Sequence, residues 1–160
     1  MRPVVLAVAV FNNKGTLKLK PVDMIEIHDP ENGTYGDCFR ACIASLLERD
    51  PKDVPHFCGY DDSKEITGKW NIDVNKWLAQ YGFAYVEWPV SSQEDYEPFF
   101  KQREENHPNY PLYHVITGNS PNFENTSHAV VGKNGKVFHD PSTTRKGVLN
   151  HEMYGFIIKL

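Results

Sequence analysis

The chain has 160 residues, the length of one typical domain, and a chain of this size can fold without disulfide bonds or structural metal ions. Hydrophobic residues make up 40% and charged residues 24%, which excludes a disordered or fibrous protein. With 17 Lys and Arg against 21 Asp and Glu, the net charge of −4 argues against a general nucleic-acid binder. Three cysteines are too few for a disulfide scaffold and favour free thiols in a reducing compartment, so we expect a cytoplasmic protein.

The first part of the chain is expected to form strands. Its longest apolar run, Val4–Phe11, is much shorter than the roughly 20 residues that a membrane helix needs. We interpret this run as one strand and Thr16–Ile27 as one or two more, so that residues 1–30 contribute N-terminal strands. We expect no membrane association and no cleaved signal segment.

The clearest helix is predicted over residues 37–49, with Asp37 as its N-cap and Asp50-Pro51 ending it. Apolar residues recur at helical spacing and predict one buried stripe. This stripe consists of Phe39, Cys42, Ile43, Leu46 and Leu47. Cys38 stands at the first helical position, beside the stripe.

The remaining segments predict two further helices and a mostly antiparallel sheet. Helices are expected over residues 72–81 and, in a more polar stretch, 93–105. Strands are expected over residues 83–88, 112–117, 127–132, 136–140 and 154–160. An early helix followed by an antiparallel sheet predicts an α+β fold in a single domain, 1–160, with residues 111–160 forming the later part of the sheet.

Cys38 is the cysteine best placed for nucleophilic chemistry. A cysteine attacks as its thiolate, and an ordinary thiol pKa of about 8.5 leaves little thiolate at neutral pH. A helix N-terminus supplies partial positive charge and free N–H groups, which favour the thiolate and can stabilise an oxyanion on an attacked carbonyl. Such a thiol also needs a base, and the base needs an orienting group.

His128 and Asp140 are the residues that a hairpin could bring together for this purpose. A two-residue loop at Asn134-Gly135 would place them on opposite faces of the hairpin. A three-residue loop with a bulge at Gly135 would place His128 opposite Asp140. We predict the bulged turn, because the proposed chemistry requires it.

Three segments together resemble the papain-like cysteine peptidases. They are Gly36-Asp37-Cys38-Phe39-Arg40-Ala41-Cys42-Ile43-Ala44-Ser45-Leu46-Leu47, His128-Ala129-Val130-Val131 and His139-Asp140-Pro141. They are similar in particular to the branch that contains bacteriocin-leader peptidases and small bacterial and phage relatives. The resemblance implies a papain-like fold, in which a central N-terminal helix carries the cysteine and packs on a mostly antiparallel sheet.

The resemblance also implies the roles of individual residues. Cys38 would be the nucleophile, His128 the general base and then acid, and Asp140 the group that orients His128. The Cys38 backbone N–H would form part of the oxyanion hole. The family's second oxyanion donor is a Gln six residues before the nucleophile, where this chain has Asn32, one methylene shorter.

These roles imply a hydrolase that cleaves a peptide or isopeptide bond in a peptide or protein substrate, without a cofactor or metal. An acyltransferase could use the same triad, and a binding module could keep the frame without catalysis. A structural zinc site is a further alternative, since one Cys₃His set is compatible with the spacing. Its members would be Cys38, Cys42, His56 and Cys58. Nothing in the sequence indicates the oligomeric state.

Overall fold

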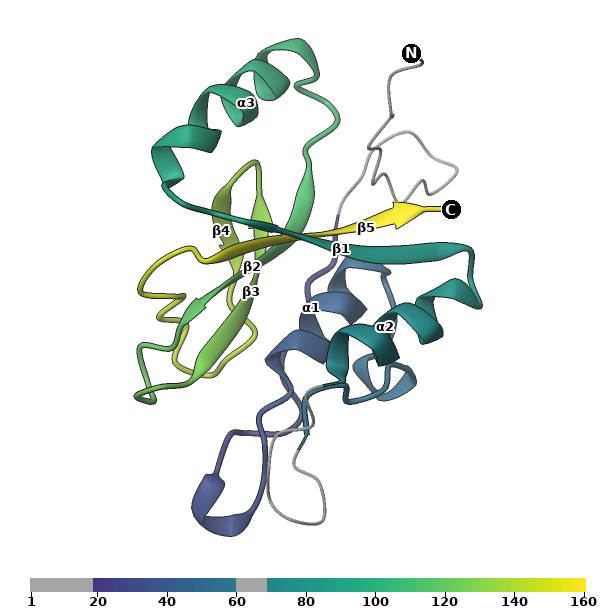
Figure 1. The fold of residues 1–160 in the computed structure, drawn as a ribbon, viewed down its shortest axis with the longest axis vertical. Helices are drawn as coiled ribbons and strands as arrows, with labels where there is room; N and C mark the ends of the chain where they lie inside the picture. The colour runs from purple at the N-terminus through teal and green to yellow at the C-terminus, as the bar shows by residue number, and fades with distance from the viewer. Residues whose placement is uncertain (1–18, 60–68) are drawn as a thin grey trace.

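The structure is a computed structural model that describes residues 19–59 and 69–160 (Figure 1). Helices in these ranges are α1 (Cys38–Leu46), α2 (Trp70–Ala79) and α3 (Gln93–Asn106), with 3₁₀ helices η1 (Pro30–Asn32) and η2 (Pro51–Asp53). The strands are β1 (Phe83–Pro89), β2 (Tyr113–Asn119), β3 (Ser127–Lys133), β4 (Lys136–His139) and β5 (Met153–Lys159). The strand expected at Val4–Phe11 lies outside the described residues.

The five described strands form one antiparallel sheet in the order β1-β5-β2-β3-β4, which confirms the α+β class. The first strand in the sequence therefore pairs with the last one. Figure 1 shows α1 and α2 on one side of this sheet and α3 at the other. No helix in the described ranges is both long and apolar enough to cross a membrane.

Alternating side chains of the strands build a separate core on each face of the sheet. Val115 packs with α1 and α2, whereas its neighbour Ile116 packs with Phe100 of α3. In β3, Val131 likewise belongs to the core with α1 and α2, and Val130 to the core with Phe100. The sheet is therefore buried on both faces, and α1 lies on the β3 side of the first core.

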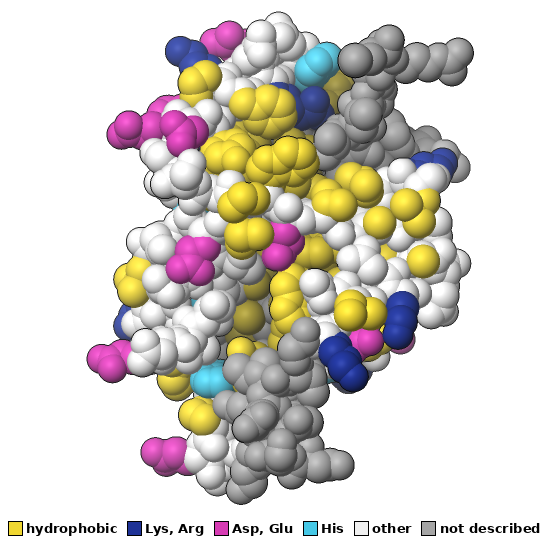
Figure 2. Space-filling model, viewed as in Figure 1, with side chains coloured by type: hydrophobic (Ala, Val, Ile, Leu, Met, Phe, Trp, Pro, Cys, Tyr) yellow, Lys and Arg dark blue, Asp and Glu magenta, His cyan; other side chains and the backbone are white. Residues whose placement is uncertain are grey.

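Hydrophobic side chains also remain visible on the surface around β1 and β5 (Figure 2). β1 is an edge strand, because β5 is its one partner within the described sheet. Trp88 of β1 is half exposed, as is Phe99 of α3. Single exposed aromatic residues of this kind are common on protein surfaces.

The predicted apolar stripe explains how α1 packs. Four of its five residues are buried, and Leu47 is partly buried. The helix ends at Leu46, earlier than expected, because Glu48 takes a positive φ of 52° and the Arg49 N–H turns back to the Ala44 carbonyl at 2.9 Å. A left-handed residue after the last turn is a common helix stop, so the helix ends before the proline is reached.

Residues 19–28, here called the arm, contain no strand, so the described part of the prediction for Thr16–Ile27 is wrong. Backbone amides of the arm donate to groups outside any β-ladder. These bonds are Val22 to Ser45 Oγ at 2.9 Å, Met24 to the Pro141 carbonyl at 3.0 Å, and Ile25 and Glu26 to Asp37 Oδ1 at 3.1 and 3.0 Å. Amides that are satisfied in this way have no need of a neighbouring strand.

Two helix predictions need smaller corrections. α2 begins at Trp70, before the predicted start at Ile72, and the chain leaves it through Gly82 with a φ of 76°. Its buried residues are Val74 and Leu78. The polar stretch is helical as predicted and continues to Asn106, with the Ser92 hydroxyl accepting from the Glu94 N–H at its start.

The hairpin between β3 and β4 has a two-residue turn, so the predicted three-residue turn with a bulge at Gly135 is wrong. Lys133 pairs with Lys136, and the two turn residues, Asn134 and Gly135, have positive φ values of 49° and 79°. Positive φ at both central positions defines a type I′ turn, whose twist suits a hairpin. The Asn134 side chain also accepts the Leu112 N–H at 2.9 Å, which ties the turn to the residue before β2.

A bulge further along β4 supplies the extra residue that the turn was expected to supply. The pairings on its two sides are Val131 with His139 and Gly132 with Val137. Phe138 is therefore the unpaired residue. Because one inserted residue exchanges the two faces of a strand, the bulge returns Asp140 to a side from which its carboxylate reaches His128.

The close packing of β1 against its neighbour β5 predicts a mutational effect. A methyl group at Gly155 would overlap the Tyr85 side chain, which is buried and cannot swing away. Gly155→Ala should therefore lower the free energy of unfolding in urea by about 1–3 kcal/mol. Gly59→Ala is the matched control, since nothing lies within 4 Å of its added methyl. Equal stability of the two variants would contradict this packing.

Candidate active site

Cys38 begins α1, as predicted, but Asp37 does not cap the helix with its side chain. The Asp37 carboxylate is fully buried and accepts the amides of Ile25 and Glu26 from the arm. Arg40 also donates to it, through Nε at 2.7 Å and through a second guanidinium nitrogen. Asp37 therefore fastens the arm to the start of the helix beside Cys38.

The structure brings His128 and Asp140 together. His128 is the second residue of β3, Asp140 directly follows β4, and both side chains are buried. His128 Nε2 lies 2.8 Å from Asp140 Oδ1. This contact leaves Nδ1 as the ring nitrogen for the Cys38 thiol, which also interacts with His128. The three predicted triad residues thus meet where the start of α1 approaches the start of β3.

The loop that follows β4 holds the Asp140 carboxylate in place. Its Oδ1 accepts the Ser142 N–H at 2.8 Å, and its Oδ2 accepts the Gly147 N–H at 2.7 Å. Burial alone would raise the pKa of Asp140, but the bonds from His128, Ser142 and Gly147 outweigh burial and lower it well below its ordinary value. Asp140 is therefore a fixed negative charge at neutral pH.

His128 is held in its charged form by the same contacts. Burial disfavours the imidazolium, but the hydrogen bond to Asp140, the contact with the Cys38 sulfur and the charges of both partners outweigh it. Together they raise the pKa of His128 to about 9. A protonated imidazole therefore stands beside the Cys38 sulfur at neutral pH.

A set of polar contacts outside the triad links the arm to the Asp140 loop. The Arg145 guanidinium donates to both oxygens of Asp23, each at 2.7 Å, and also to the Asp140 carbonyl. His139 Nε2 lies 3.1 Å from Asp23 Oδ1. The arm therefore bonds both to Asp37, the residue before Cys38, and to the loop that holds Asp140.

Two cavities meet at Cys38 and His128. One has a volume of about 250 Å³, and we call it the hydroxyl cavity because Ser120, Ser142, Thr143 and Thr144 contribute to its lining. The other has a volume of about 340 Å³, and we call it the acidic cavity because its lining contains Glu87 and Glu152. Both cavities are also lined by Tyr35, Gly36 and Ser127. A bound molecule could thus extend to either side of the sulfur.

The structure does not bring Asn32 to this site, contrary to the expected oxyanion role. Asn32 is exposed in η1, within the long loop that precedes α1 (Figure 1). Its side-chain nitrogen donates to Asp29 Oδ2 at 2.6 Å, and it lines neither cavity beside Cys38. Asn32 therefore has the sequence position of the family's oxyanion donor, but its side chain does not lie at the Cys38 site.

The zinc alternative finds no support in the arrangement of its four residues. Cys42 is completely buried in the first core, and His56 Nε2 is bonded to the Tyr35 carbonyl at 2.9 Å. Burial, with smaller contributions from Cys38 and Glu87, raises the pKa of Cys58 to about 12. Within residues 19–59 and 69–160, no three His, Cys, Asp or Glu side chains are arranged to hold a metal ion. All three cysteines are free.

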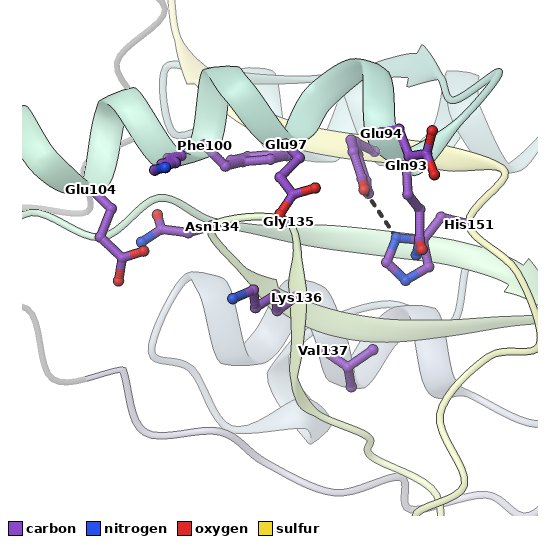
Figure 3. Close-up of a pocket in the computed structure, with 12 residues that line it drawn as sticks. Gln93, Glu94, Glu97, Phe100, Glu104, Asn134, Gly135, Lys136, Val137 and His151 are labelled. Carbon is purple, nitrogen blue, oxygen red and sulfur yellow. Dashed lines mark hydrogen bonds between the residues drawn. The ribbon is translucent and has the colours of Figure 1, made fainter.

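A larger cavity of about 530 Å³ lies between α3 and the β3–β4 turn, away from the triad residues (Figure 3). Its lining mixes acidic side chains of α3, such as Glu97 and Glu104, with Lys136 across the gap. The dashed line in Figure 3 is the 2.9 Å bond between His151 Nδ1 and the Tyr154 hydroxyl. No cysteine lines this cavity, so it is separate from the candidate site at Cys38.

Sequence reasoning did not identify Glu87 as a site residue. The signal was available in the strand predicted over residues 83–88, because strand residues two apart share a face. Glu87 shares its face with Phe83 and Tyr85, two inward-facing aromatic residues. A carboxylate at such a position is a reason to look for a site. The contacts of Asp23 with Arg145 carry no comparable signal, since 122 positions separate the two residues.

Comparisons with known proteins do not identify a relative of this chain. No protein-family model, no curated protein and no solved structure matches it. The functional assignment therefore depends on the residues and their geometry.

The His128–Asp140 pair predicts how stability changes with pH. The pKa of His128 is raised from 6.5 to about 9 on folding, so its stabilising contribution is complete below pH 6.5 and is lost as the pH rises through about 9. The pKa of Asp140 is lowered from 3.8, so its contribution is lost as the pH falls below that value. The stability difference between wild type and His128→Gln, measured in urea, should therefore shrink from pH 6.5 to 9. A difference that grows over this interval would contradict the pairing.

The three thiols should differ in their reactivity with iodoacetamide at pH 7. Cys38 lines both cavities and lies beside the charged His128, whereas burial raises the pKa of both Cys42 and Cys58. Peptide mass spectrometry should show Cys38 alkylated well before the other two, and His128→Gln should slow its alkylation. Equal, slow labelling of all three cysteines would favour a passive scaffold.

Proposed function

We propose that the chain is a papain-like cysteine hydrolase that cleaves a peptide or isopeptide bond through Cys38, His128 and Asp140. The observation that carries the proposal is the 2.8 Å contact between His128 and Asp140, with Cys38, at a helix start, interacting with the same imidazole ring. A nucleophile, a base and an orienting carboxylate in this sequence of contacts form the arrangement that thiol catalysis needs. The antiparallel sheet with α1 against it supports the papain-like part of the proposal.

The first half of the proposed reaction forms an acyl-enzyme. The imidazolium of His128 favours the Cys38 thiolate, which attacks the carbonyl carbon of the scissile amide. Asp140 keeps the ring oriented and stabilises its positive charge. As the tetrahedral intermediate collapses, His128 gives its proton to the leaving nitrogen, and a thioester with Cys38 remains.

The backbone at the start of α1 would stabilise the intermediate. The N–H groups of Cys38, Phe39 and Arg40 have no hydrogen-bond acceptor among the described residues, as expected for the first turn of a helix. In the proposed mechanism the Cys38 N–H donates to the oxyanion, and Asn32 takes no part in this role. In the second half, the now neutral His128 removes a proton from water as the water oxygen attacks the thioester carbonyl. The C–S bond breaks, the acid is released, and the Cys38 thiolate and His128 imidazolium are restored.

An acyltransferase is the main alternative, because an amine that replaces water at the thioester uses the same three residues. A non-catalytic binding module would keep the cavities without turnover. A reducing, cytoplasmic location is part of the proposal, and the three free cysteines support it. A single domain over residues 1–160 with a peptide or protein substrate completes it.

Acylation by p-nitrophenyl acetate tests the proposal without knowledge of the natural substrate. Wild-type protein should accumulate an acetyl thioester on Cys38, detected by peptide mass spectrometry, and should release nitrophenol in more than one turnover. Cys38→Ala should abolish turnover, and His128→Gln should lower its rate by roughly 10²- to 10⁴-fold. Asp140→Asn should lower the rate while the protein stays folded by circular dichroism.

Glu97→Gln is the matched control for these variants, because Glu97 lines the separate cavity on α3. It should acetylate at the wild-type rate. A fully active Cys38→Ala variant, or acetylation spread evenly over the three cysteines, would end the proposal. Retained acetylation of Cys38 with no second turnover in water would favour the binding module or a transferase.

A further inference from the structure

The lining of the acidic cavity carries charges of both signs. It contains Cys38 and the imidazolium of His128, together with the carboxylates of Glu87 and Glu152. His128 is the one positively charged group among the described residues that line the cavity, and no Lys or Arg is among them. This distribution would orient a bound molecule that carries a cation.

Glu87 faces the cavity from β1 and is held there by its neighbour. Tyr85, which is on the same face of the strand, belongs to the first core, and its hydroxyl donates to Glu87 Oε1 at 3.1 Å. Interactions with Cys38 and with Glu87 add to the effect of burial in raising the pKa of Cys58. Cys58 lines the same cavity, so Glu87 and the nucleophile lie within electrostatic range of one wall.

Glu87 has no cationic partner in the part of the chain that the structure describes. Among the described residues its side chain accepts one hydrogen bond, from the Tyr85 hydroxyl, and Glu152 accepts a long one from Asn150 Nδ2 at 3.3 Å. Burial raises the pKa of Glu87, which shows that its environment disfavours the bare carboxylate. A bound cation would restore the lost solvation of this charge.

The apolar residues in the lining suit the hydrocarbon part of such a cation. Phe39 and Trp70 both line the cavity and pack edge to face with ring centroids 5.2 Å apart. Met153 adds a flexible apolar side chain. Aromatic and apolar walls that share one cavity with a carboxylate favour an alkyl chain with a terminal ammonium or guanidinium, both by contact area and by cation–π attraction.

We propose that the acidic cavity is a subsite for an alkylammonium or alkylguanidinium group of the molecule that reacts at Cys38, with Glu87 as its main anionic contact. The inference rests on the proposed function, because it assigns the cavity to the reactant of Cys38. The cation has two chemical sources. It can be a basic side chain of the peptide substrate, or one end of a diamine whose free amine attacks the thioester.

In the second case the step is an acyl transfer. The neutral nitrogen of the diamine attacks the thioester carbonyl, a C–N bond forms, the C–S bond breaks, and the nitrogen's proton passes to His128. The ammonium at the other end stays at Glu87 throughout. No oxidant or further reactant is needed.

Charged methanethiosulfonate reagents test the subsite independently of turnover. The Cys38 sulfur attacks the sulfenyl sulfur, a mixed disulfide forms, and methanesulfinate leaves. The measured quantity is the ratio of rate constants at Cys38 for the aminoethyl reagent, which is cationic, and the neutral methyl reagent. Glu87→Gln should lower this ratio by roughly three- to tenfold, and 0.5 M salt should lower the wild-type ratio. Cleavage after Arg40 separates the Cys38 peptide from Cys42 for mass spectrometry.

Glu97→Gln is again the control and should keep the wild-type ratio. An anionic sulfonatoethyl reagent should show the reverse preference. If Glu87→Gln does not fold, Glu152→Gln takes its place and should lower the ratio less, because Glu152 is exposed. A wild-type ratio no higher than that of free cysteine, or a ratio that Glu87→Gln leaves unchanged, overturns the inference while the proposed function stands. Failure of Cys38 to outpace Cys58 with the neutral reagent rejects the proposed function instead.

Two assays identify the source of the cation. If the peptide substrate carries the cation, a peptidyl coumarin amide with Lys next to the scissile bond should be cleaved faster than the same amide with norleucine. Glu87→Gln should remove this difference in rate. With p-nitrophenyl acetate and cadaverine, formation of acetylcadaverine that depends on Glu87 identifies a diamine acceptor. Absence of both effects, with acetylation of Cys38 intact, counts against the subsite.

Discussion

The carboxylate of Asp140 is the group on which the rest of the site depends. It accepts hydrogen bonds from the His128 ring and from the Ser142 and Gly147 amides, so His128 and the loop that follows β4 are held by the same carboxylate. A buried carboxylate is stable only when donors satisfy it, and here donors from two parts of the chain do so. The Arg145 guanidinium, bonded to the Asp140 carbonyl, extends this anchor to Asp23 of the arm.

Asp37 makes a second anchor of the same kind on the nucleophile side. It collects two arm amides and Arg40, so the residue before Cys38 cannot move without moving the arm. Two buried carboxylates that are 103 positions apart in the sequence therefore position the two halves of the candidate site. The polypeptide between Asp23 and Glu26 joins them, which explains why the arm uses its amides there rather than in a strand.

Short-range patterns were enough to predict the parts of the fold that follow from local periodicity. The stripe from Phe39 to Leu46 identified α1 and placed Cys38 at its first residue, and alternation identified the strands.

The pairing of His128 with Asp140 was predicted for a chemical reason, and the structure shows the contact, although through a different turn. The type I′ geometry at Asn134 was an available local signal, but the bulge at Phe138 was not, since nothing in that residue's type marks it as unpaired.

Asn32 was placed by counting positions, which gives no information about the direction of a loop. The arm and Glu87 depend on contacts between distant segments, which no single-sequence pattern reports.

The bulge in β4 has a consequence for how this site can vary between related chains. Each residue gained or lost between the turn and Asp140 exchanges inside for outside, so the carboxylate's position depends on whether the number of residues there is odd or even. Loss of Phe138 alone would leave the hairpin, its turn and its pairing intact, yet would aim Asp140 away from His128. Length changes in this strand that preserve the orientation of Asp140 must therefore come in pairs, or together with a second bulge. The orientation of Asp140 therefore depends on whether this segment has an odd or even number of residues, whereas the pairing of the hairpin does not.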